Sequence, residues 1–419
     1  MSCYSPTAGI NALQVPGVVG DGVHDDTEGL QTALDSGAAT VYLPRPSRAY
    51  LISRTLVIHS GQTLQADRAA VIRLADGAHA HMLTNADHDA GDENITILGG
   101  IWDGNNAHQT CDYHEGVSGQ TPWNPARYLG VLFQLNHVTD LRIAHLTLKD
   151  PETYGLQIGN VRRFTVEDIT FDYNLLKLNM DGVHVHGPAR EGRIVNVKGA
   201  TNDDAVALNA DDAPIGEMCR GPISDIQVDG IWGENSYTAV RLLSAGSPVS
   251  RVRLSNIYGT YRYYAVSFTH HNVHPGAEST FEDIVMDGVF CAKSPEGQEE
   301  SRRTAPLIWF APGTVTRGAH IQNFHRTEHA EGAADSIVVD TDATVDYLAV
   351  SDASLINHTR GPVNLVKNAG TLGTLSLSNL RATAVGGAPR GFVVENSGTI
   401  RRVHQTNVTP ENVLPEVLP

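Results

Sequence analysis

The sequence predicts an all-β fold, a single right-handed parallel β-helix in which short strands stack in successive coils. Two strand patterns alternate along much of the 419 residues, and copies of each return after about 23 to 34 residues. The 40 glycines and 20 prolines are spread along the chain, which is typical of many turns between short strands and of few long helices. Repeats of this length indicate stacked units that cannot bury their apolar faces alone.

The first pattern is apolar-x-apolar-x-x-apolar. Its copies are Leu141/Ile143/Leu146, Phe164/Val166/Ile169, Val195/Val197/Ala200, Ile226/Val228/Ile231, Val252/Leu254/Ile257, Ile284/Met286/Val289, Leu348/Val350/Ala353 and Leu375/Leu377/Leu380. The second pattern is a small residue, an apolar residue, any residue and an apolar residue, with copies that begin at Gly155, Gly182, Ala205, Ala239 and Ala265. A leucine-rich repeat would need an asparagine ladder and a tighter period, and a propeller would need four strands per repeat. Neither pattern is found in the sequence. A β-sandwich is the alternative fold.

The N-terminal segment, about residues 20–60, differs from the repeats. Asp25-Asp26-Thr27 precedes a stretch that places Leu30, Ala33 and Leu34 on one helical face and ends near Gly37. We expect a short helix there that caps the β-helix, since an uncovered end exposes core and strand edges. No linker indicates a second domain, so residues 1–419 are expected to form one domain with an exposed tail at about 407–419.

The composition excludes several classes of partner. The formal net charge of −17, with no long run of Lys or Arg, argues against nucleic acid. No segment approaches the roughly 18 continuous apolar residues of a membrane span, and the first residues lack the parts of a signal peptide. We therefore expect no membrane, and either a cytoplasmic protein or a secreted one with its leader removed. The cysteines lack zinc-site spacing and are expected to be free thiols: Cys3, Cys111, Cys219 and Cys291.

Three aspartates are the candidate catalytic residues. When Gly182-Val183-x-Val185 is superposed on Ala205-Val206-x-Leu208, Asp181 falls in register with Asp204, and Asp203 lies one residue earlier. Residues in register on successive parallel strands lie about 4.8 Å apart, so the three carboxylates are expected to meet. Glycoside hydrolysis needs a carboxylic acid that protonates the leaving oxygen and a carboxylate that activates water or attacks. The alternatives are solvated turn residues and a calcium site; we expect no metal and no cofactor.

Side chains that alternate outward from these strands are candidates for binding substrate, because they would floor a groove beside the carboxylates. One outward column contains Gln157, Ala207, Arg241 and Ser267, and the next contains Gly159, His186, Asn209, Leu243 and Thr269. The candidate substrate-binding residues are Tyr154, Gln157, His184, His186, Asn209, Tyr237, Arg241 and His270. Arg241 could contact an acidic sugar or pair with an aspartate, and Tyr154 could line the groove or pack in the fold.

Several motifs follow one another in the order of a known family. Gly20–Thr27, the expected helix and Val41–Pro44 resemble the opening of the pectate-lyase-superfamily β-helices. Further motifs are similar in order and spacing to those of the polygalacturonases, family 28 of the glycoside hydrolases: Gly99–Gly104, Leu148–Pro151, Asn179–Gly182 and Asn202–Asp204. The similarity covers roughly residues 20–264.

The resemblance implies inverting hydrolysis, with Asp203 as the general acid and with Asp181 and Asp204 activating water. The chain departs from the family at two places. The family's Gly-His-Gly is expected just before Ala239, where the chain reads Glu234–Tyr237. Its Arg-Ile-Lys, which contacts a uronate carboxylate, is expected about one coil later, where the chain reads Tyr264-Ala265-Val266-Ser267. The resemblance therefore extends to the cleavage chemistry and not to specificity for galacturonan.

Together these features predict a glycoside hydrolase that cleaves a plant or microbial poly- or oligosaccharide, pectic glycans included. The rival enzyme is a polysaccharide lyase or a glycan-rearranging transferase, because one fold hosts several chemistries and the histidines offer bases for proton abstraction. The rival without catalysis is a β-helix that binds carbohydrate. Carbohydrate is the expected partner in each case.

Overall fold

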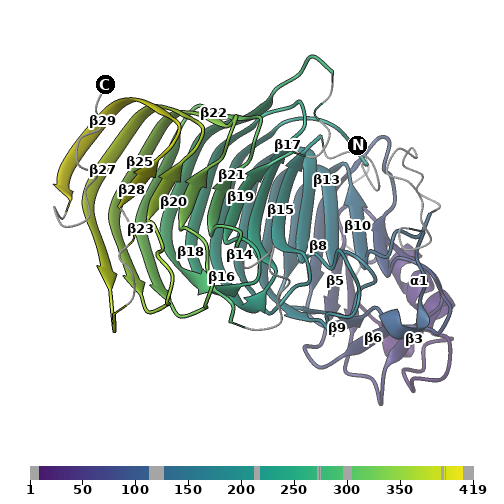
Figure 1. Ribbon diagram of the computed structural model, residues 1–419. Coiled ribbons are helices and arrows are strands. Elements are labelled where there is room, and N and C mark those ends of the chain that lie inside the picture. The colour runs from purple at the N-terminus through teal and green to yellow at the C-terminus, as the bar shows by residue number, and fades with distance from the viewer. Residues whose placement is uncertain are drawn as a thin grey trace. The chain divides into compact units, whose positions relative to one another are not determined.

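The computed structural model describes residues 9–112, 127–211, 218–270, 273, 275–295, 304–387, 391 and 393–408. The chain divides into two compact units: unit 1 is residues 1–202 and 214–219, and unit 2 is residues 203–213 and 220–419. Regular structure in both units is mainly parallel β-strand (Figure 1). The predicted all-β class, a parallel β-helix with a short N-terminal helix, is confirmed. Of the expected tail, Asn407 and Val408 end a strand, and 409–419 lie outside the described residues.

Unit 1 builds its coils from three strands each. Its helices are η1 (Ala12–Gln14), α1 (Thr27–Asp35) and η2 (Asn106–His108). Its strands are β1 (Ile10–Asn11), β2 (Thr40–Leu43), β3 (Tyr50–Ile52), β4 (Leu56–Ile58), β5 (Thr63–Ala66), β6 (Val71–Leu74), β7 (Leu83–Asn85), β8 (Asp92–Leu98), β9 (Ile101–Asp103), β10 (Phe133–Asn136), β11 (Val138–Ala144), β12 (Thr147–Lys149), β13 (Leu156–Asp172) and β14 (Val183–Lys198). These strands pair in three parallel ladders, β1-β2-β5-β8-β11-β13, β3-β6-β9-β12-β13 and β4-β7-β10-β13-β14. The long strand β13 takes part in all three.

The predicted N-terminal helix is present as α1. Its apolar face, Leu30, Ala33 and Leu34, is buried, and the helix packs against β4. Asp26 precedes the helix without capping it through its side chain. Its buried carboxylate instead accepts the backbone N–H groups of Val19 at 2.6 Å and of Leu51 at 3.1 Å. A buried carboxylate needs such donors, so Asp26 ties the helix start to the preceding loop and to β3.

Unit 2 has the same parallel-strand architecture, with its strands in two main ladders. Its strands are β15 (Asp204–Ala210), β16 (Ile223–Ser236), β17 (Thr238–Ser244), β18 (Val249–Tyr261), β19 (Val266–Thr269), β20 (Ser279–Lys293), β21 (Ile308–Phe310), β22 (Thr314–Thr316), β23 (Ala319–Glu328), β24 (Ile337–Val339), β25 (Thr344–Asn357), β26 (Val366–Asn368), β27 (Thr371–Ala384), β28 (Val394–Asn396) and β29 (Thr399–Val408). One ladder is β15-β17-β19-β21-β24-β26-β28. The other is β16-β18-β20-β23-β25-β27-β29, with β22 between β20 and β25.

The first sequence pattern marks residues that stack inward on successive coils of unit 2. Ile226/Val228/Ile231 lie opposite Val252/Leu254/Ile257, which in turn lie opposite Ile284/Met286/Val289, and all are buried. The residue before the third apolar position has a positive φ: 79° at Gly230, 57° at Asn256 and 83° at Gly288. Glycine and asparagine tolerate this conformation best. The two variable positions therefore let the chain bend while its apolar side chains stay inside.

One predicted copy of the pattern, Val195/Val197/Ala200, has the wrong register. Phe164, Val166 and Ile169 lie opposite Gly192, Ile194 and Val197, and neither Val195 nor Ala200 is fully buried. A β-carbon at Gly192 would overlap the ring of Phe164. The Phe164 ring therefore fills the volume of two inward positions, and glycine replaces the apolar residue that the pattern would have at 192.

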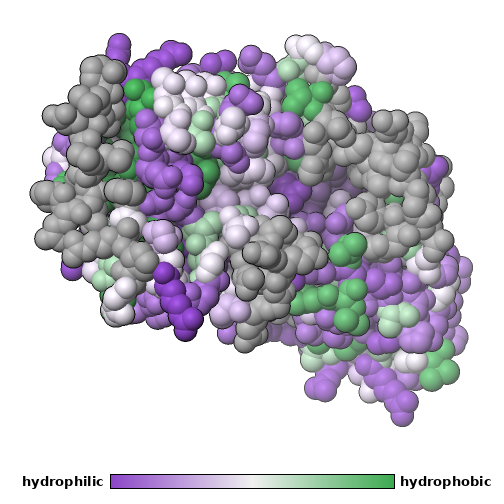
Figure 2. All heavy atoms as spheres, in the orientation of Figure 1, coloured by the Kyte–Doolittle hydropathy of each residue, from purple (hydrophilic) through white to green (hydrophobic). Residues whose placement is uncertain are grey.

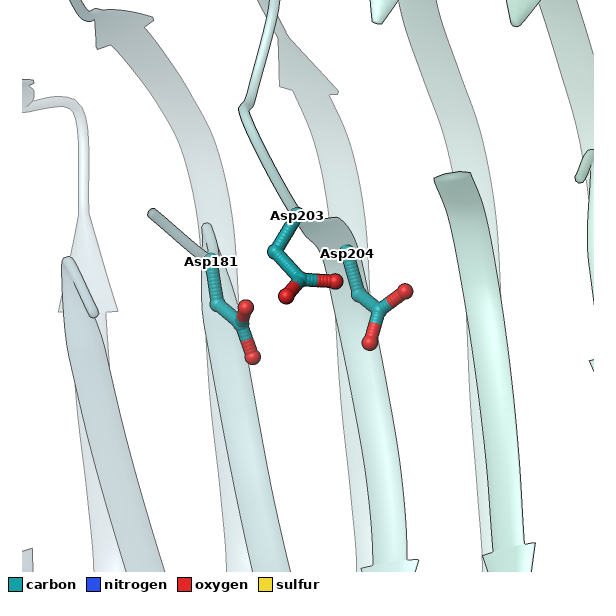
Figure 3. Close-up of side chains that lie close together, drawn as sticks. All are labelled: Asp181, Asp203 and Asp204. Atoms are coloured by element: carbon teal, nitrogen blue, oxygen red, sulfur yellow. The ribbon is translucent and has the colours of Figure 1, made fainter. Parts of the chain in front are cut away.

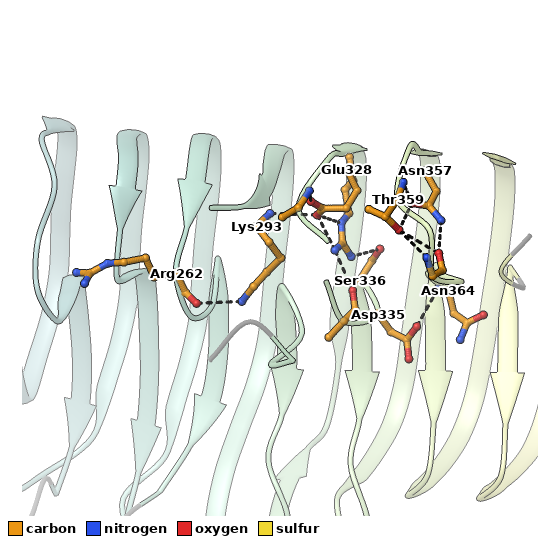
Figure 4. A network of polar contacts seen from close by, with 12 residues as sticks. Arg262, Lys293, Glu328, Asp335, Ser336, Asn357, Thr359 and Asn364 are labelled. Carbon is orange, nitrogen blue, oxygen red and sulfur yellow. Dashed lines mark hydrogen bonds and ion pairs between the residues drawn. The ribbon is translucent and has the colours of Figure 1, made fainter. Parts of the chain in front are cut away.

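Unit 2 encloses a polar network, part of which Figure 4 shows. The ammonium of Lys293 donates hydrogen bonds to the carbonyl oxygens of Arg262, at 3.3 Å, and of Tyr263. The backbone N–H of Lys293 donates to Oε2 of Glu328 at 3.1 Å, and Nη2 of Arg326 donates to the same oxygen at 2.7 Å. Lys293, Arg326 and Glu328 are each buried, and burial lowers the pKa of Lys293 to about 7.

The face drawn in Figure 2 is mostly hydrophilic, with small hydrophobic clusters between polar side chains. Within the described residues no helix is both long enough and apolar enough to cross a membrane. Among the described residues no disulfide joins the cysteines Cys111, Cys219 and Cys291, and Cys3 lies outside the described residues.

Candidate active site

Asp181 is the candidate catalytic residue of unit 1, two positions before β14. Its carbonyl oxygen accepts the N–H of Gly155 at 2.9 Å and the hydroxyl of Tyr173 at 3.1 Å, which holds its backbone in place. The side chain is buried, and Oδ2 lies 2.6 Å from Nδ1 of His184. Asp181 therefore does not face solvent as a turn residue would, but forms a buried carboxylate–imidazole pair.

The imidazole of His184 lies between two other rings. The Tyr154 ring stacks on it with centroids 4.3 Å apart and an interplanar angle of 14°. On β14, the His186 ring lies 4.6 Å away at 41°. Val183 and Val185 lie in the core as predicted. Tyr154, for which the sequence left two roles open, packs against His184.

A chain of polar contacts runs beside this pair. Gln134 donates from Nε2 to Oε1 of Gln157 at 2.8 Å, and Nε2 of Gln157 lies 3.0 Å from Nε2 of His186. The predicted register is confirmed in unit 1, because Gln157 lies opposite His184, and Gly159 opposite His186. These contacts fix the orientation of the Gln157 amide.

The predicted exposure of these residues is wrong. Gln157, His184 and His186 are 0%, 2% and 1% exposed, so they do not floor an open groove. One cause for His186 is found at Gly159, its neighbour in register, where a β-carbon would lie 2.7 Å from Sγ of Cys219 and 3.2 Å from Cε of Met218: these two side chains cover the strand there. Such a cover comes from a distant part of the chain, and strand alternation alone does not reveal it.

In unit 2, Asp203 and Asp204 stand side by side where β15 begins (Figure 3). Arg241 lies on β17, and its Nε is 2.8 Å from Oδ2 of Asp204 while its Nη2 is 3.3 Å from Oδ1 of Asp203. The Asp204 side chain is 2% exposed and that of Asp203 is 18% exposed. Of the two roles that the sequence left open for Arg241, the structure shows pairing with aspartates. The predicted column is confirmed here, since Ala207, Arg241 and Ser267 lie opposite one another in turn.

The three remaining predicted residues lie at different places in unit 2. Asn209 is buried on β15 opposite Leu243. Tyr237 precedes β17, and the guanidinium carbon of Arg262 lies 5.6 Å from its ring centroid. His270 follows β19, and its Nε2 lies 2.8 Å from the carbonyl oxygen of Pro312.

An aromatic cluster near Tyr237 was missed at the level of the sequence. The Tyr263 ring lies 5.2 Å from that of Tyr237 and 3.8 Å from that of Tyr264, and Tyr264 stacks on Trp309 at 5.0 Å and 7°. Burial raises the pKa of Tyr264 well above its usual range, and Arg241 opposes that rise. The signal was present, because Tyr237 and Tyr263 stand at the same offset before Ala239-Val240 and Ala265-Val266. The cluster places aromatic side chains close to Arg241 and thus beside the aspartate pair.

Comparison with known proteins identifies solved structures of similar fold. No protein-family model matches the chain, and no curated protein matches it. Among solved structures, the polygalacturonase of Erwinia carotovora ssp. carotovora is 16% identical, with 95% of this chain and 98% of that chain covered and a TM-score of 0.54. The family 28 exopolygalacturonase of Yersinia enterocolitica is 13% identical, with 97% and 79% covered and a TM-score of 0.56.

A protein described as a surface adhesin has a similar structure. PfbA of Streptococcus pneumoniae is 14% identical, with 96% of this chain and 93% of that chain covered and a TM-score of 0.55. At such identities the likeness concerns fold and does not decide between an enzyme and an adhesin. The resemblance that the motifs predicted is thus confirmed at the level of the fold: the chain has the fold of the family 28 polygalacturonases.

Proposed function

We propose that the chain is a glycoside hydrolase in which Asp181, Asp203 and Asp204 form one acidic centre. The observation that carries the proposal is the pair Asp203 and Asp204 at the start of β15, both contacted by Arg241. Asp181 is added to this pair by the register of the two repeats in the sequence. Neighbouring carboxylates such as Asp203 and Asp204 repel each other when both are ionised, which favours one protonated and one ionised member. That combination is what hydrolysis of a glycosidic bond needs.

The environments of the aspartates support different roles. Asp204 is nearly inaccessible and has the shorter contact with Arg241, which favours its ionised form and the role of a base that holds water. Asp203 is more exposed and has the longer contact, so it is better placed to reach a leaving oxygen as the general acid. Asp181, oriented by His184, is the second carboxylate for the water.

Arg241 also bears on the alternative of a metal site. Three carboxylates could hold a calcium ion, which prefers oxygen ligands. The Arg241 guanidinium is already paired with two of the three, and its positive charge opposes a second cation at the same place. The arrangement therefore favours acid–base catalysis without a metal.

The proposal is tested with a panel of pectic, rhamnogalacturonan and neutral glycans. Release of reducing ends without ultraviolet absorbance of unsaturated products supports hydrolysis. Turnover of no glycan, together with binding of one, would instead indicate a non-catalytic β-helix. NMR of the first product identifies its anomer and so decides between inversion and retention. The resemblance implies inversion. Retaining enzymes have the two carboxyl groups only about 5–5.5 Å apart.

One observation favours a second candidate, a polysaccharide lyase. Elimination requires a base beside a uronate, and the buried Asp181–His184 pair with Tyr154 stacked on it resembles such a base with a proton donor near it. A lyase would give ultraviolet absorbance in step with each chain cleavage in the same assay. Hydrolysis remains the first proposal, because it uses all three carboxylates.

A further inference from the structure

We infer that His184 is a positioning residue for Asp181: it fixes one oxygen of this carboxylate so that the other is presented to the reacting water. This inference rests on the proposed function. The contact between Nδ1 and Oδ2, at 2.6 Å, joins two side chains that are 3% and 4% exposed. A hydrogen bond to a carboxylate in such a setting is shorter and stronger than one between neutral groups.

The surroundings of His184 are suited to holding its ring in one orientation. Tyr154 covers the ring in a near-parallel stack, and the His186 ring lies with its centroid 4.6 Å from that of His184. Both partners are fixed in turn, Tyr154 by its place directly before Gly155, whose N–H binds the Asp181 carbonyl, and His186 by Gln157. A ring clamped in this way directs its Nδ1–H at Asp181 without losing further conformational freedom when substrate binds.

The hydrogen bond assigns the two oxygens of Asp181 to different tasks. Oδ2 accepts from His184, whereas Oδ1 has no hydrogen bond within the described part of the chain. The backbone of Asp181 is separately held through its carbonyl oxygen. His184 therefore determines the rotation of the carboxylate and thereby the position of Oδ1. This role differs from the substrate contact that its outward position had predicted, because the buried ring is not open to a sugar.

His186 provides a matched control. It lies on the same strand two residues later, is equally buried, and its Nε2 lies 3.0 Å from the amide nitrogen of Gln157. If burial of an imidazole were all that mattered, replacement of either histidine would have the same effect. If positioning of Asp181 matters, activity depends on a hydrogen-bond donor at the Nδ1 position of residue 184 and not on one at residue 186.

The test compares His184→Asn, His184→Leu and His186→Asn on the glycan that the wild type cleaves. Asparagine keeps a donor near the Nδ1 position, and leucine keeps volume without a donor. We expect His184→Leu to lower kcat by about 100-fold with KM nearly unchanged, and His184→Asn to recover most of that loss. Equal losses in the leucine and asparagine variants, or a kcat of His186→Asn as low as that of His184→Leu, would overturn the inference. Thermal unfolding of each variant separates these effects from loss of the fold.

A second measurement does not depend on turnover and so separates failure of this inference from failure of the proposed function. Nitrogen-15 NMR of the histidine rings should show His184 protonated at Nδ1 in a strong hydrogen bond, and Asp181→Asn should weaken that bond. An Nδ1 without a proton in the wild type would contradict the inference even if the protein proves to be an active hydrolase. A wild type that cleaves no glycan, with the NMR signature intact, would refute only the proposed function.

Discussion

Arg241 is the residue on which the charge balance of the aspartate pair depends. Its guanidinium contacts both Asp203 and Asp204, and the Asp204 side chain is almost completely buried. We predict that Arg241→Met lowers the free energy of unfolding by about 3 kcal/mol, because it leaves a buried carboxylate without this cation. Urea unfolding measures the change. The double variant Arg241→Met/Asp204→Asn should recover most of the loss, and a double variant less stable than Arg241→Met would contradict the pairing argument.

A surface pair serves as the control for this prediction. Arg251 and Asp225 contact each other at 2.7 Å, but their side chains are 55% and 43% exposed. Water screens such a pair, so Arg251→Met should change the free energy of unfolding by less than about 1 kcal/mol.

The sequence predicted the position of Arg241 but left its partner open between an acidic sugar and an aspartate. Counting along β17 placed Arg241 outward in a column with Ala207 and Ser267, and the structure confirms that register. The count did not determine which way a long side chain turns. The same limit applies to His184, whose outward position was predicted while its burial and its contact with Asp181 were not.

At the scale of the strand, close approach of the coils makes some glycines irreplaceable. Gly259 of β18 lies opposite Gly233 of β16, and its φ is +122°. A β-carbon at Gly259 would overlap the carbonyl oxygen of Gly233. Gly259→Ala should therefore lower the free energy of unfolding by about 3 kcal/mol or prevent folding. Gly361, with open space around it, is the control, and Gly361→Ala should be nearly neutral. Equal stability of the two variants in urea would contradict this packing.

The buried ammonium of Lys293 predicts how stability depends on pH. In the folded protein its pKa is lowered from 10.5 to about 7 by burial, so between these values the unfolded chain binds more protons. The free energy of unfolding should then rise with pH above about 7, by up to roughly 1.4 kcal/mol per pH unit. Above pH 9 the raised pKa values of Cys291 and of buried tyrosines such as Tyr261 make the free energy of unfolding fall as pH rises, which opposes the effect of Lys293. The useful window is therefore about pH 7.5–9.

Comparison of two lysine variants isolates this contribution. Lys293→Met should remove the slope of stability against pH in that window, whatever its effect on stability at a single pH. Lys367 is a half-exposed lysine paired with Asp335 and Glu395, and Lys367→Met should keep the slope. A slope that persists in Lys293→Met would show that another group causes it.

The apolar pattern predicted the register of several neighbouring strands, such as Ile226/Val228/Ile231 beside Val252/Leu254/Ile257. It failed at Val195, because the register there depends on the volume of Phe164 in the neighbouring coil and on the glycine opposite it. It also omitted Ala319/Ile321/Phe324, which lie opposite Ile284/Met286/Val289. A pattern within one strand does not record the volume available in the next coil, which is set by packing between segments distant in sequence.

For the molecule as a whole, the net charge of −17 predicts how activity depends on ionic strength. A polyuronate approaching an acidic protein is repelled, and raising salt from about 10 mM to about 150 mM shortens the screening length from roughly 30 Å to roughly 8 Å. KM for a polyuronate should therefore fall severalfold over this range, while KM for a neutral glycan stays nearly constant. A KM for polyuronate that rises with salt would show that a basic groove outweighs the overall charge.

The central claim, that Asp203 protonates the leaving oxygen, is tested most directly by comparing two leaving groups in Asp203→Asn. A natural sugar leaving group needs the acid, whereas a nitrophenyl leaving group departs without one. We predict that Asp203→Asn loses about 10³-fold or more in kcat on the glycan and keeps most of its activity on the matching nitrophenyl glycoside, with folding intact. Near-normal turnover of the glycan by Asp203→Asn, or an equal loss on both substrates, would contradict the account.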